Sequence, residues 1–535
     1  MAGAGTTCGG LWLAETFKAE PFGDLAVRSY IGTNRRTTDL GPYITEIYPP
    51  QMYPGDGAAD HLQFHIRHEP INLELLSRVF SVAGPRFVQE WVNSKPTSQY
   101  ARRAAFLYEF LTGEDLLQPS GLRGSYVSAL DSEKNLSANI VGTEDRISKW
   151  KVINNMPGTR FFCPAIPLSE RLMDAFNYNI SRHYDEIIEE FGAELLSRSA
   201  SWLTTRESRA SFAIEKESGE TNRIQRFAQV IATWTGHDGP PAHGSDVPDG
   251  RKPYASILSE QRLSRLQQAI LGDAALLPSC GYRESPVFVG QTSHHSQVVH
   301  YLAPPAEDVA VMLEGIETFL ERTQYQSPVM RAAIASFGFV YVHPLIDGNG
   351  RVHRFLINDI LRRDGATTDD VILPVSVAIN DDPTSRRAYD DVLDKISSPL
   401  MNQIRPHISF AAKPTTYPDG MESDLVFSED GMARPTWRYA NYAPHVIYMA
   451  DVINTTIVHH MRAEAVYLRS HDNARLALKE ICEMPDTLAD EIIRSVTGNS
   501  EDSVGRKLRR DHSQVTDEMW ASFVQAVRDA FAQKR

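Results

Sequence analysis

The architecture of this chain is best inferred from one segment, His343-Pro344-Leu345-Ile346-Asp347-Gly348-Asn349-Gly350-Arg351-Val352-His353-Arg354. An almost wholly apolar run, SPVMRAAIASFGFVYV at 327–342, precedes it, which predicts a helix buried in the core. Because a proline disfavours helix at the residue before it, we expect this helix to end at His343. An amphipathic run, VHRFLINDILRRDG at 352–365, follows and predicts a second helix that closes at Gly365. The segment is therefore expected to be a loop between two core helices.

The glycines and arginines of this segment suit a loop that binds a polyphosphate. Gly348 and Gly350 permit positive φ and a close approach of the backbone, and successive N–H groups in such a turn form an anion-binding concavity. The second helix begins here, so the positive end of its dipole faces the same point. Arg351 and Arg354 lie three residues apart, on neighbouring positions of one helical face. Two guanidinium groups placed in this way can bind two different phosphates.

Two further side chains complete the expected chemistry. Asp347 offers a hard oxygen ligand for a magnesium ion that phosphates also coordinate. His343 has an ordinary pKa near neutrality and is the natural general base. A His-Pro turn, a Gly-Asn-Gly turn and an arginine pair each have an ordinary structural meaning when they stand alone. Their occurrence together within twelve residues favours the functional interpretation.

The segment resembles the signature of the Fic (filamentation induced by cAMP) family, His-Pro-Phe-x-Asp/Glu-Gly-Asn-Gly-Arg-x-x-Arg. It departs from it at Leu345, where Phe is usual, and this apolar exchange conserves volume. The resemblance implies an all-α core that transfers AMP from ATP to a protein hydroxyl. It also implies roles for single residues: His343 deprotonates the target Tyr, Thr or Ser, Asp347 binds Mg²⁺, Asn349 with the backbone of Gly348 and Gly350 holds the α- and β-phosphates, Arg351 binds the β-phosphate and Arg354 binds the γ-phosphate.

A second feature, GYRESPVFVGQTSHHSQVVHYLAPP at 281–305, resembles the flap of Fic proteins. The residues Val287-Phe288-Val289-Gly290 and the run 298–302 have strand character, which predicts a β-hairpin. An exposed hairpin edge can bind an extended target segment through main-chain hydrogen bonds. An ordinary structural hairpin would be preferred if the signature were absent.

A third feature, SRASFAIEKES at 208–218, resembles the inhibitory Ser/Thr-x-x-x-Glu-Gly/Asn motif of Fic proteins whose brake precedes the core. Ser211 and Glu215 are four residues apart and can share one helix face. The resemblance implies that Glu215 pairs with Arg354 and excludes the γ-phosphate. Lys216 stands where Gly or Asn is usual, which leaves open how the helix ends and how strong the brake is. An ordinary exposed glutamate is the alternative.

Composition bounds the remaining possibilities. The 535 residues carry a net charge of −14, which argues against general binding to nucleic acid or anionic membranes. The four cysteines are far apart, so a disulfide framework or cysteine zinc site is disfavoured, and reduced thiols in a cytoplasmic setting fit best. No apolar run has the length of a membrane-spanning helix, and no signal peptide is recognisable at the start.

The sequence predicts a mostly α protein with a Fic-type core, a short hairpin flap and flanking, mainly helical domains. The expected divisions are 1–168 (partly irregular, then helical), 169–412 (catalytic), 413–436 (linker) and 437–535 (C-terminal, helical). Residues 487–520 combine helix–turn–helix-like spacing with a basic cluster at Arg506, Lys507, Arg509 and Arg510. DNA binding there is conceivable, but the surrounding acidic residues favour a plain helical interaction domain.

The resemblance predicts a protein adenylyltransferase that uses MgATP and is auto-inhibited by Glu215. Its expected target is a protein bound at the flap, and the enzyme itself is one candidate target. Two alternatives stay open. One is a Fic-type transferase that uses another donor and transfers another group, such as UMP, because the glycines do not select the nucleotide base. The other is a regulatory protein that binds DNA or a protein, and whose core is kept silent by Glu215.

Overall fold

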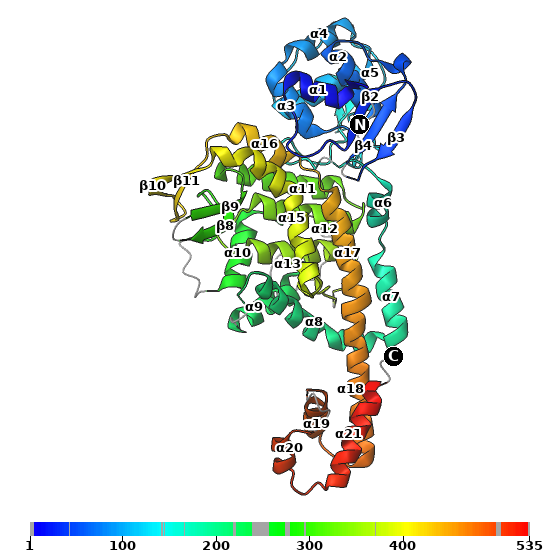
Figure 1. Ribbon diagram of the computed structural model, residues 1–535, viewed down its shortest axis with the longest axis vertical. Coiled ribbons are helices and arrows are strands. Elements are labelled where there is room, and N and C mark those ends of the chain that lie inside the picture. The colour runs from blue at the N-terminus through cyan, green and yellow to red at the C-terminus, as the bar shows by residue number, and fades with distance from the viewer. Residues whose placement is uncertain are drawn as a thin grey trace.

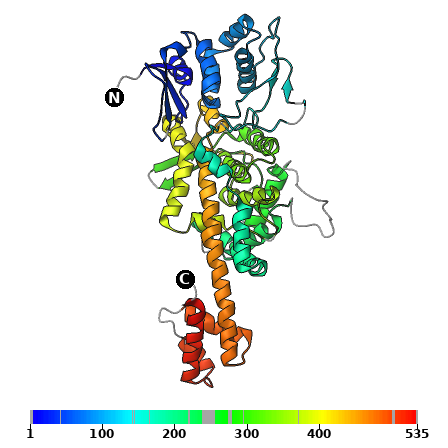
Figure 2. The ribbon, with the colours of Figure 1, turned by 90° about the vertical axis from the view of Figure 1, so that its right-hand side faces the viewer.

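The computed structural model describes residues 5–41, 43–140, 143, 145–164, 166–217, 221–237, 256–272, 279–293, 296–369, 371–498 and 504–532. Helices dominate, and the strands form only small sheets of two to four strands. The predicted mostly α class is confirmed. An N-terminal region, a central helical body and a C-terminal module follow one another along the long axis of the molecule (Figures 1 and 2).

The N-terminal region combines a sheet with a helical cluster. Its sheet has the strand order β1-β2-β4-β3, with β2 and β4 parallel. The start of the predicted N-terminal domain, which was expected to be partly irregular, has this sheet and a helix. The elements are β1 (Thr6–Cys8), α1 (Gly9–Phe17), β2 (Val27–Ile31), β3 (Arg36–Asp39), β4 (Ile44–Tyr48), α2 (Ala58–His68), α3 (Leu73–Ala83), α4 (Arg86–Ser94), α5 (Gln99–Thr112) and the short strands β5 (Val127–Ser128), β6 (Arg146–Ile147) and β7 (Val152–Ile153).

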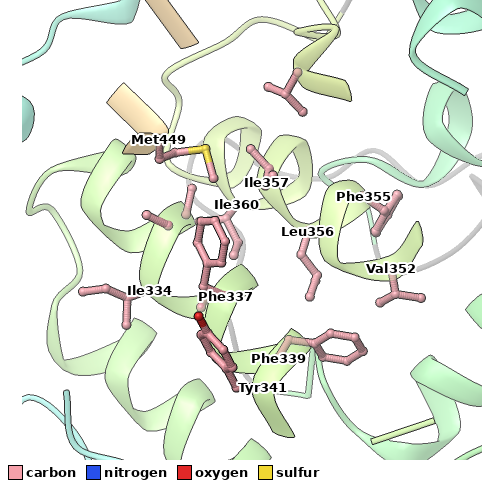
Figure 3. Packing of buried hydrophobic residues seen from close by; sticks show 14 of the residues in the cluster. Ile334, Phe337, Phe339, Tyr341, Val352, Phe355, Leu356, Ile357, Ile360 and Met449 are labelled. Atoms are coloured by element: carbon pink, nitrogen blue, oxygen red, sulfur yellow. The ribbon is translucent and has the colours of Figure 1, made fainter. Parts of the chain in front are cut away.

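Two helices form the centre of the body, α12 (Pro328–Val342) and α13 (Asn349–Arg363). The Ser327 side chain caps α12 by accepting from the backbone N–H of Met330, and a proline occupies its first turn. α12 is buried on almost all sides, as the apolar run before the signature predicted. α13, which was predicted to be amphipathic, is buried on almost all sides as well. Figure 3 shows the side chains that fill the space between these helices and α17 (Ala443–Thr455), among them Phe337, Ile360 and Met449.

The other elements of the body surround this pair. α11 lies against α12, and α8 packs on α9 and α14. Their bounds are α6 (Glu170–Phe176), α7 (Ile180–Phe191), α8 (Ala193–Ile214), α9 (Thr221–Trp234), α10 (Glu260–Leu271), β8 (Phe288–Ser293), β9 (Ser296–Leu302), α11 (Ala306–Arg322), α14 (Val375–Ile379), α15 (Pro383–Ile404), β10 (Ser409–Thr416), β11 (Glu422–Val426) and α16 (Asp430–Arg438).

The N-terminal region joins the body through an inserted aromatic ring. Phe162 belongs to the core cluster of the body, although it precedes the predicted boundary at 168. A Cβ at Gly315 of α11 or Gly338 of α12 would lie only 2.7–2.8 Å from its side chain. These two glycines therefore make room for the ring. The N-terminal region and the body consequently share part of one hydrophobic core.

Two predicted divisions differ from the structure. Residues 413–436, interpreted as a linker, contain most of the β10–β11 hairpin and the start of α16. The predicted C-terminal domain begins at 437, yet α17 and the π-helical turn η3 (Thr456–Met461) belong to the core cluster of the body. Their apolar faces supply the last layer over α12. Local composition could not reveal this layer, because it is set by packing between distant segments.

A separate module lies beyond this layer. α18 (Arg462–Ile481) continues the line of α17 away from the body and carries α19 (Asp486–Gly498), α20 (Arg506–Asp511) and α21 (Asp517–Ala532) (Figure 1). The module has its own apolar cluster, which includes Trp520 and Phe523. Within the residues that the structure describes, no helix combines the length and the apolar composition needed to cross a bilayer.

Candidate active site

The signature forms the connection between α12 and α13, as predicted. His343 ends α12 with φ 50°, in the left-handed region that an L-residue seldom adopts. Gly348 precedes α13 with φ 92°, where glycine avoids strain. Between them, the Asn349 side chain donates to the Leu345 carbonyl (2.7 Å) and accepts from the Leu345 N–H (3.0 Å). Asn349 therefore braces the loop with its amide group, and a contribution to phosphate binding is left to its backbone N–H.

The His343 imidazole is oriented as a proton acceptor. Its Nδ1 lies 3.2 Å from the Val340 carbonyl oxygen, which can only accept, so Nδ1 carries the hydrogen. Nε2 then keeps its lone pair. Burial, followed by the positive charge of Arg283, lowers the pKa of His343 to about 4. The imidazole is consequently neutral at physiological pH and available to remove a proton.

The N-terminus of α13 offers an anion site, and a carboxylate already lies in it. A Cβ at Gly350 would stand 2.1 Å from Oε1 of Glu215 and 3.3 Å from Nη1 of Arg354. Only glycine leaves room here for a negatively charged group against the first turn of the helix. The helix dipole favours an anion at this point. Glu215 therefore occupies the position where a phosphate of a nucleotide would be favoured.

Arg354 is enclosed by the helix that carries this carboxylate. Its side chain is 1% exposed. Nη2 donates to Oε1 of Glu215 (2.6 Å) and to the Ser211 carbonyl (3.2 Å), while Nε donates to the Ser211 hydroxyl (2.7 Å). Burial opposes ionisation of Glu215, but Arg354, with further help from Arg351 and Arg386, lowers its pKa below the ordinary value. The contact predicted between Glu215 and Arg354 is present.

Arg351 contacts a second carboxylate of the same segment, which the sequence did not indicate. Its Nη1 donates to Glu217 (3.2 Å) and its Nη2 to Oδ1 of Asp347 (2.8 Å). The guanidinium group also lies over the Phe212 ring, 5.2 Å from its centroid. Both arginines of the signature are thus engaged by acidic residues that follow α8.

The end of α8 explains how both carboxylates reach the site. Lys216 has φ 62°, and its N–H donates to the Ala213 carbonyl, while the Glu217 N–H donates to the Phe212 carbonyl. This is the Schellman pattern, in which a left-handed residue reverses the chain after a helix. Lys216 adopts the conformation for which Gly or Asn is favoured, at some strain. The reversal turns Glu217 back toward Arg351.

A third acidic residue fixes the same helix from its buried face. Glu207 lies on α8 two helical turns before Glu215, and its carboxylate accepts from the backbone N–H (2.7 Å) and the hydroxyl (2.5 Å) of Ser376 in α14. Burial raises the pKa of Glu207 to about 7, against the lowering effect of these hydrogen bonds. The docking of α8 on α14 therefore involves a carboxyl group, that of Glu207, whose pKa lies near neutrality.

The donor set fits a magnesium ion that a nucleotide brings with it. Asp347 is 43% exposed and supplies one carboxylate beside the anion site. In the described part of the chain, no group of three or more His, Cys, Asp or Glu side chains could hold a metal ion. Mg²⁺ typically needs only one or two protein carboxylates when phosphates and water complete its shell. Asp347 would hold the ion, after Arg351 has released one of its oxygens.

The predicted flap is a hairpin of β8 and β9 with a register shift between Val289 and Gly290. Val287 lies just before β8, where its carbonyl accepts from the Ala303 N–H (3.1 Å). The Phe288 ring makes an edge contact with Phe410 of β10. Val289 is 45% exposed, as is Val298 on β9. The hairpin thus presents apolar side chains, and as a two-stranded sheet it has open edges within the described residues.

The predicted basic cluster lies outside the site. It falls on α20, where Arg509 pairs with Asp517 and Arg510 with Asp511. Residues 499–503 of the predicted helix–turn–helix segment are outside the described residues. The structure therefore brings together the signature, the brake residues and the flap, and it leaves the C-terminal cluster apart.

Comparison with known proteins agrees with this geometry. Residues 257–361 match the Fic/DOC family. Over this segment the chain is similar to Fic/DOC proteins. A "Protein adenylyltransferase Fic" of Nematostella vectensis is 30% identical over 152 residues, which are 28% of this chain and 30% of that protein. The protein of the same description from Drosophila mojavensis is 32% identical over 102 residues, 19% of this chain and 18% of that protein.

The chain therefore spans less than a third of the length of these curated relatives. A crystal structure of a Fic family protein from Desulfovibrio desulfuricans G20 covers 65% of this chain and 89% of its own at 18% identity, with a TM-score of 0.35. The matched residues of the Fic core include α10, the flap, α12 and most of α13. Helix α8, which leads to Glu215, lies before the matched segment.

Proposed function

We propose that this Fic protein transfers AMP from MgATP to a Tyr, Thr or Ser hydroxyl of a protein and that Glu215 restrains the reaction. One observation supports it above the others. A neutral imidazole, the first N–H groups of α13 and two buried guanidinium groups lie on one short loop and the first turns of the helix that follows it. The description of the relatives as protein adenylyltransferases supports AMP, rather than phosphate, as the transferred group.

The geometry suits each proton and bond of this reaction. Nε2 of His343 accepts the proton of the target hydroxyl as its oxygen attacks the α-phosphorus. The bond between the α-phosphorus and the oxygen that bridges to the β-phosphate breaks, and pyrophosphate leaves. Arg351, Arg354 and the N–H groups at the start of α13 stabilise the charge of the phosphates. A magnesium ion held by Asp347 would neutralise part of the same charge.

The brake acts by occupying these groups. Glu215 takes the site beside Gly350 and pairs with Arg354, while Glu217 pairs with Arg351. A γ-phosphate cannot bind Arg354 in its productive geometry while the carboxylate is there. The bound nucleotide would then be displaced from in-line attack, and a displacement of about 1 Å can reduce a rate roughly 100-fold.

The experiment that tests the proposal uses ATP labelled at the α- or the γ-phosphate. Transfer to the protein itself and to a cell lysate is compared for the wild type, Glu215→Gly and His343→Ala. We expect strong α-label transfer by Glu215→Gly, weak transfer by the wild type and none by His343→Ala. Glu186→Gly, an exposed acidic residue of α7, is the matched control and should behave like the wild type.

Other outcomes would redirect the assignment. Transfer of the γ-label would make the protein a kinase. If neither label is transferred by Glu215→Gly, other donors such as UTP are tested next. Failure of every donor would favour the alternative in which the core is silent and the chain acts by binding, for which the occupied arginines are a structural reason.

A further inference from the structure

A further fully buried arginine contacts the backbone of His343, and the proposed mechanism leaves it without a role. Arg283 is 1% exposed and lies between Gly281 and the flap. Among the described residues, no carboxylate lies within ion-pair distance of it. Burial lowers its pKa to about 10, which still leaves it charged at neutral pH. A buried guanidinium group without a counter-ion is costly unless its donors are satisfied.

Backbone carbonyl groups satisfy the guanidinium group, and they belong to two functional elements. On the side of the signature, Nε donates to the His343 carbonyl (2.7 Å) and Nη2 to the Val342 carbonyl (3.2 Å). On the side of the flap, Nη1 donates to the Ser285 carbonyl (3.0 Å) and Nη2 to the Pro304 carbonyl (2.6 Å). Ser285 and Pro304 lie just before and just after the hairpin. One side chain therefore connects both ends of the flap to the residue that carries the imidazole.

The contact also explains how His343 keeps its unusual backbone. His343 has φ 50°, a conformation that persists only where neighbouring contacts hold it. Its carbonyl and that of Val342 stand at the negative end of the α12 dipole, where a cation is favoured. The backbone N–H of Arg283 adds a hydrogen bond to the Pro344 carbonyl (2.8 Å). The loop is thus held against the flap by both the main chain and the side chain of Arg283.

A separate contact holds the flap without touching His343. Asp419 lies between β10 and β11, is 3% exposed, and accepts from the N–H groups of Glu284 and Ser285 (2.8 Å each). Burial opposes its ionisation, but these N–H groups and that of Met421 lower its pKa. Asp419 therefore holds only the base of the flap among these two elements, whereas Arg283 contacts both the flap and the signature loop.

We propose that Arg283 is a positioning residue that holds the flap and His343 in the mutual geometry required for transfer to a protein hydroxyl. The inference rests on the proposed function, because it assumes that the flap binds the target and that His343 is the base. A loss of this link should misplace the hydroxyl relative to Nε2. Nucleotide binding should persist, since Arg283 contacts neither the first turn of α13 nor Arg354.

The charge of Arg283 has a second consequence that can be measured directly. After burial, Arg283 is the strongest influence that lowers the pKa of His343. Replacement by glutamine removes this charge, so the pKa of His343 should rise from about 4 toward its ordinary value. A lysine at this position keeps the charge but cannot donate to all four carbonyl groups. Arg283→Lys should therefore misplace the flap relative to His343 without a rise in the pKa of His343.

The test compares Arg283→Gln, Arg283→Lys and Asp419→Asn, each in the Glu215→Gly background. The control is Arg102→Gln, because Arg102 is also buried and donates to backbone carbonyls, but in the N-terminal region. Three quantities are measured: MgATP affinity by calorimetry, the rate of self-labelling with α-labelled ATP, and the His343 titration by NMR of histidine-labelled protein, with the signal identified through His343→Ala.

We expect Arg283→Gln to bind MgATP within about twofold of its parent, to lose at least roughly tenfold in rate, and to show a raised pKa at His343. Arg283→Lys should lose rate with the pKa unchanged. Asp419→Asn should lose less rate without a change in pKa, and Arg102→Gln should change neither. The inference is overturned if Arg283→Gln leaves the His343 titration unchanged, or if Arg102→Gln shifts it equally. Absence of self-labelling in the parent would count against the proposed function, while the NMR titration still decides the role of Arg283.

Discussion

Arg354 and Arg283 are equally buried beside the same signature loop, yet their partners differ. Arg354 pairs with Glu215, a carboxylate at the end of a helix that precedes the matched Fic core. Arg283 donates only to backbone carbonyls of elements that the core itself contains. A carboxylate can be exchanged for a phosphate without leaving the guanidinium group uncompensated, whereas the carbonyl groups have no such replacement. The comparison separates an arginine paired with an exchangeable carboxylate from one held by backbone carbonyl groups.

The largest expected effect contrasts these arginines in nucleotide binding. In the Glu215→Gly background, Arg354→Gln should weaken MgATP binding by about 10- to 150-fold, because a hydrogen bond to a charged group contributes roughly 1.5–3 kcal/mol. Arg283→Gln should stay within about twofold of its parent. Calorimetry with MgATP measures both. Equal losses in the two variants would contradict the distinction.

The next effect concerns pH and the docking of α8. The pKa of Glu207 is raised to about 7 in the docked helix, against 4.5 for a free carboxyl group. Because its pKa is raised in the docked state, Glu207 stabilises the docked helix. This stabilisation is complete below pH 4.5 and is lost as the pH rises toward 7. The brake should therefore weaken between about pH 5 and 7 and change little above. The ratio of self-labelling by the wild type to that by Glu215→Gly should rise by at most about tenfold per pH unit.

Glu207→Gln is the control for this dependence. Glutamine keeps a neutral group of the same shape, so the ratio should become flat between pH 5 and 7. Both proteins carry His343, whose pKa of about 4 lies below this pH range, so its titration contributes little to the change in the ratio. If the pH dependence of the ratio persists in Glu207→Gln, it arises from the titration of another group.

A smaller effect is expected at Glu217, the second carboxylate on the signature. Its side chain is 35% exposed and forms a longer contact of 3.2 Å with Arg351. Solvent screens such a pair, so Glu217→Gln should raise self-labelling of the wild type by only about two- to fivefold. The exposed Glu186→Gln is the matched control. A rise as large as that of Glu215→Gly would show that the two carboxylates act as one unit.

The smallest effect tests the end of the brake helix. Lys216 is left-handed, a conformation that glycine adopts without strain. Lys216→Gly should strengthen the brake and lower basal self-labelling by about twofold, since the greater freedom of glycine when α8 is undocked offsets part of the gain. Lys216→Ala removes the charge but keeps the strain. If the alanine variant lowers the labelling equally, the lysine charge, rather than the backbone, is responsible.

The sequence by itself determined the parts of this protein that depend on local chemistry. A proline after His343, a glycine at positive φ, Gly348, and an apolar run of helical length defined the loop between α12 and α13. The same residues indicated which groups face a phosphate. The four-residue spacing of Ser211 and Glu215 placed both on one helix face, and the family resemblance supplied their partner. Such features follow from backbone geometry within a few residues, which is why they could be predicted.

Only the tertiary structure decided which distant groups meet. Glu217 and Arg351 are 134 residues apart, Glu207 and Ser376 are 169 apart, and Arg283 and His343 are 60 apart. No local pattern marks these pairs, because an arginine bound to carbonyl groups looks in sequence like one on a solvated face. The same holds for the hairpin in the expected linker and for α17, whose buried face exists only against α12. Packing of segments far apart in the chain selects these contacts, and with them the pairing of both signature arginines and the placement of the flap.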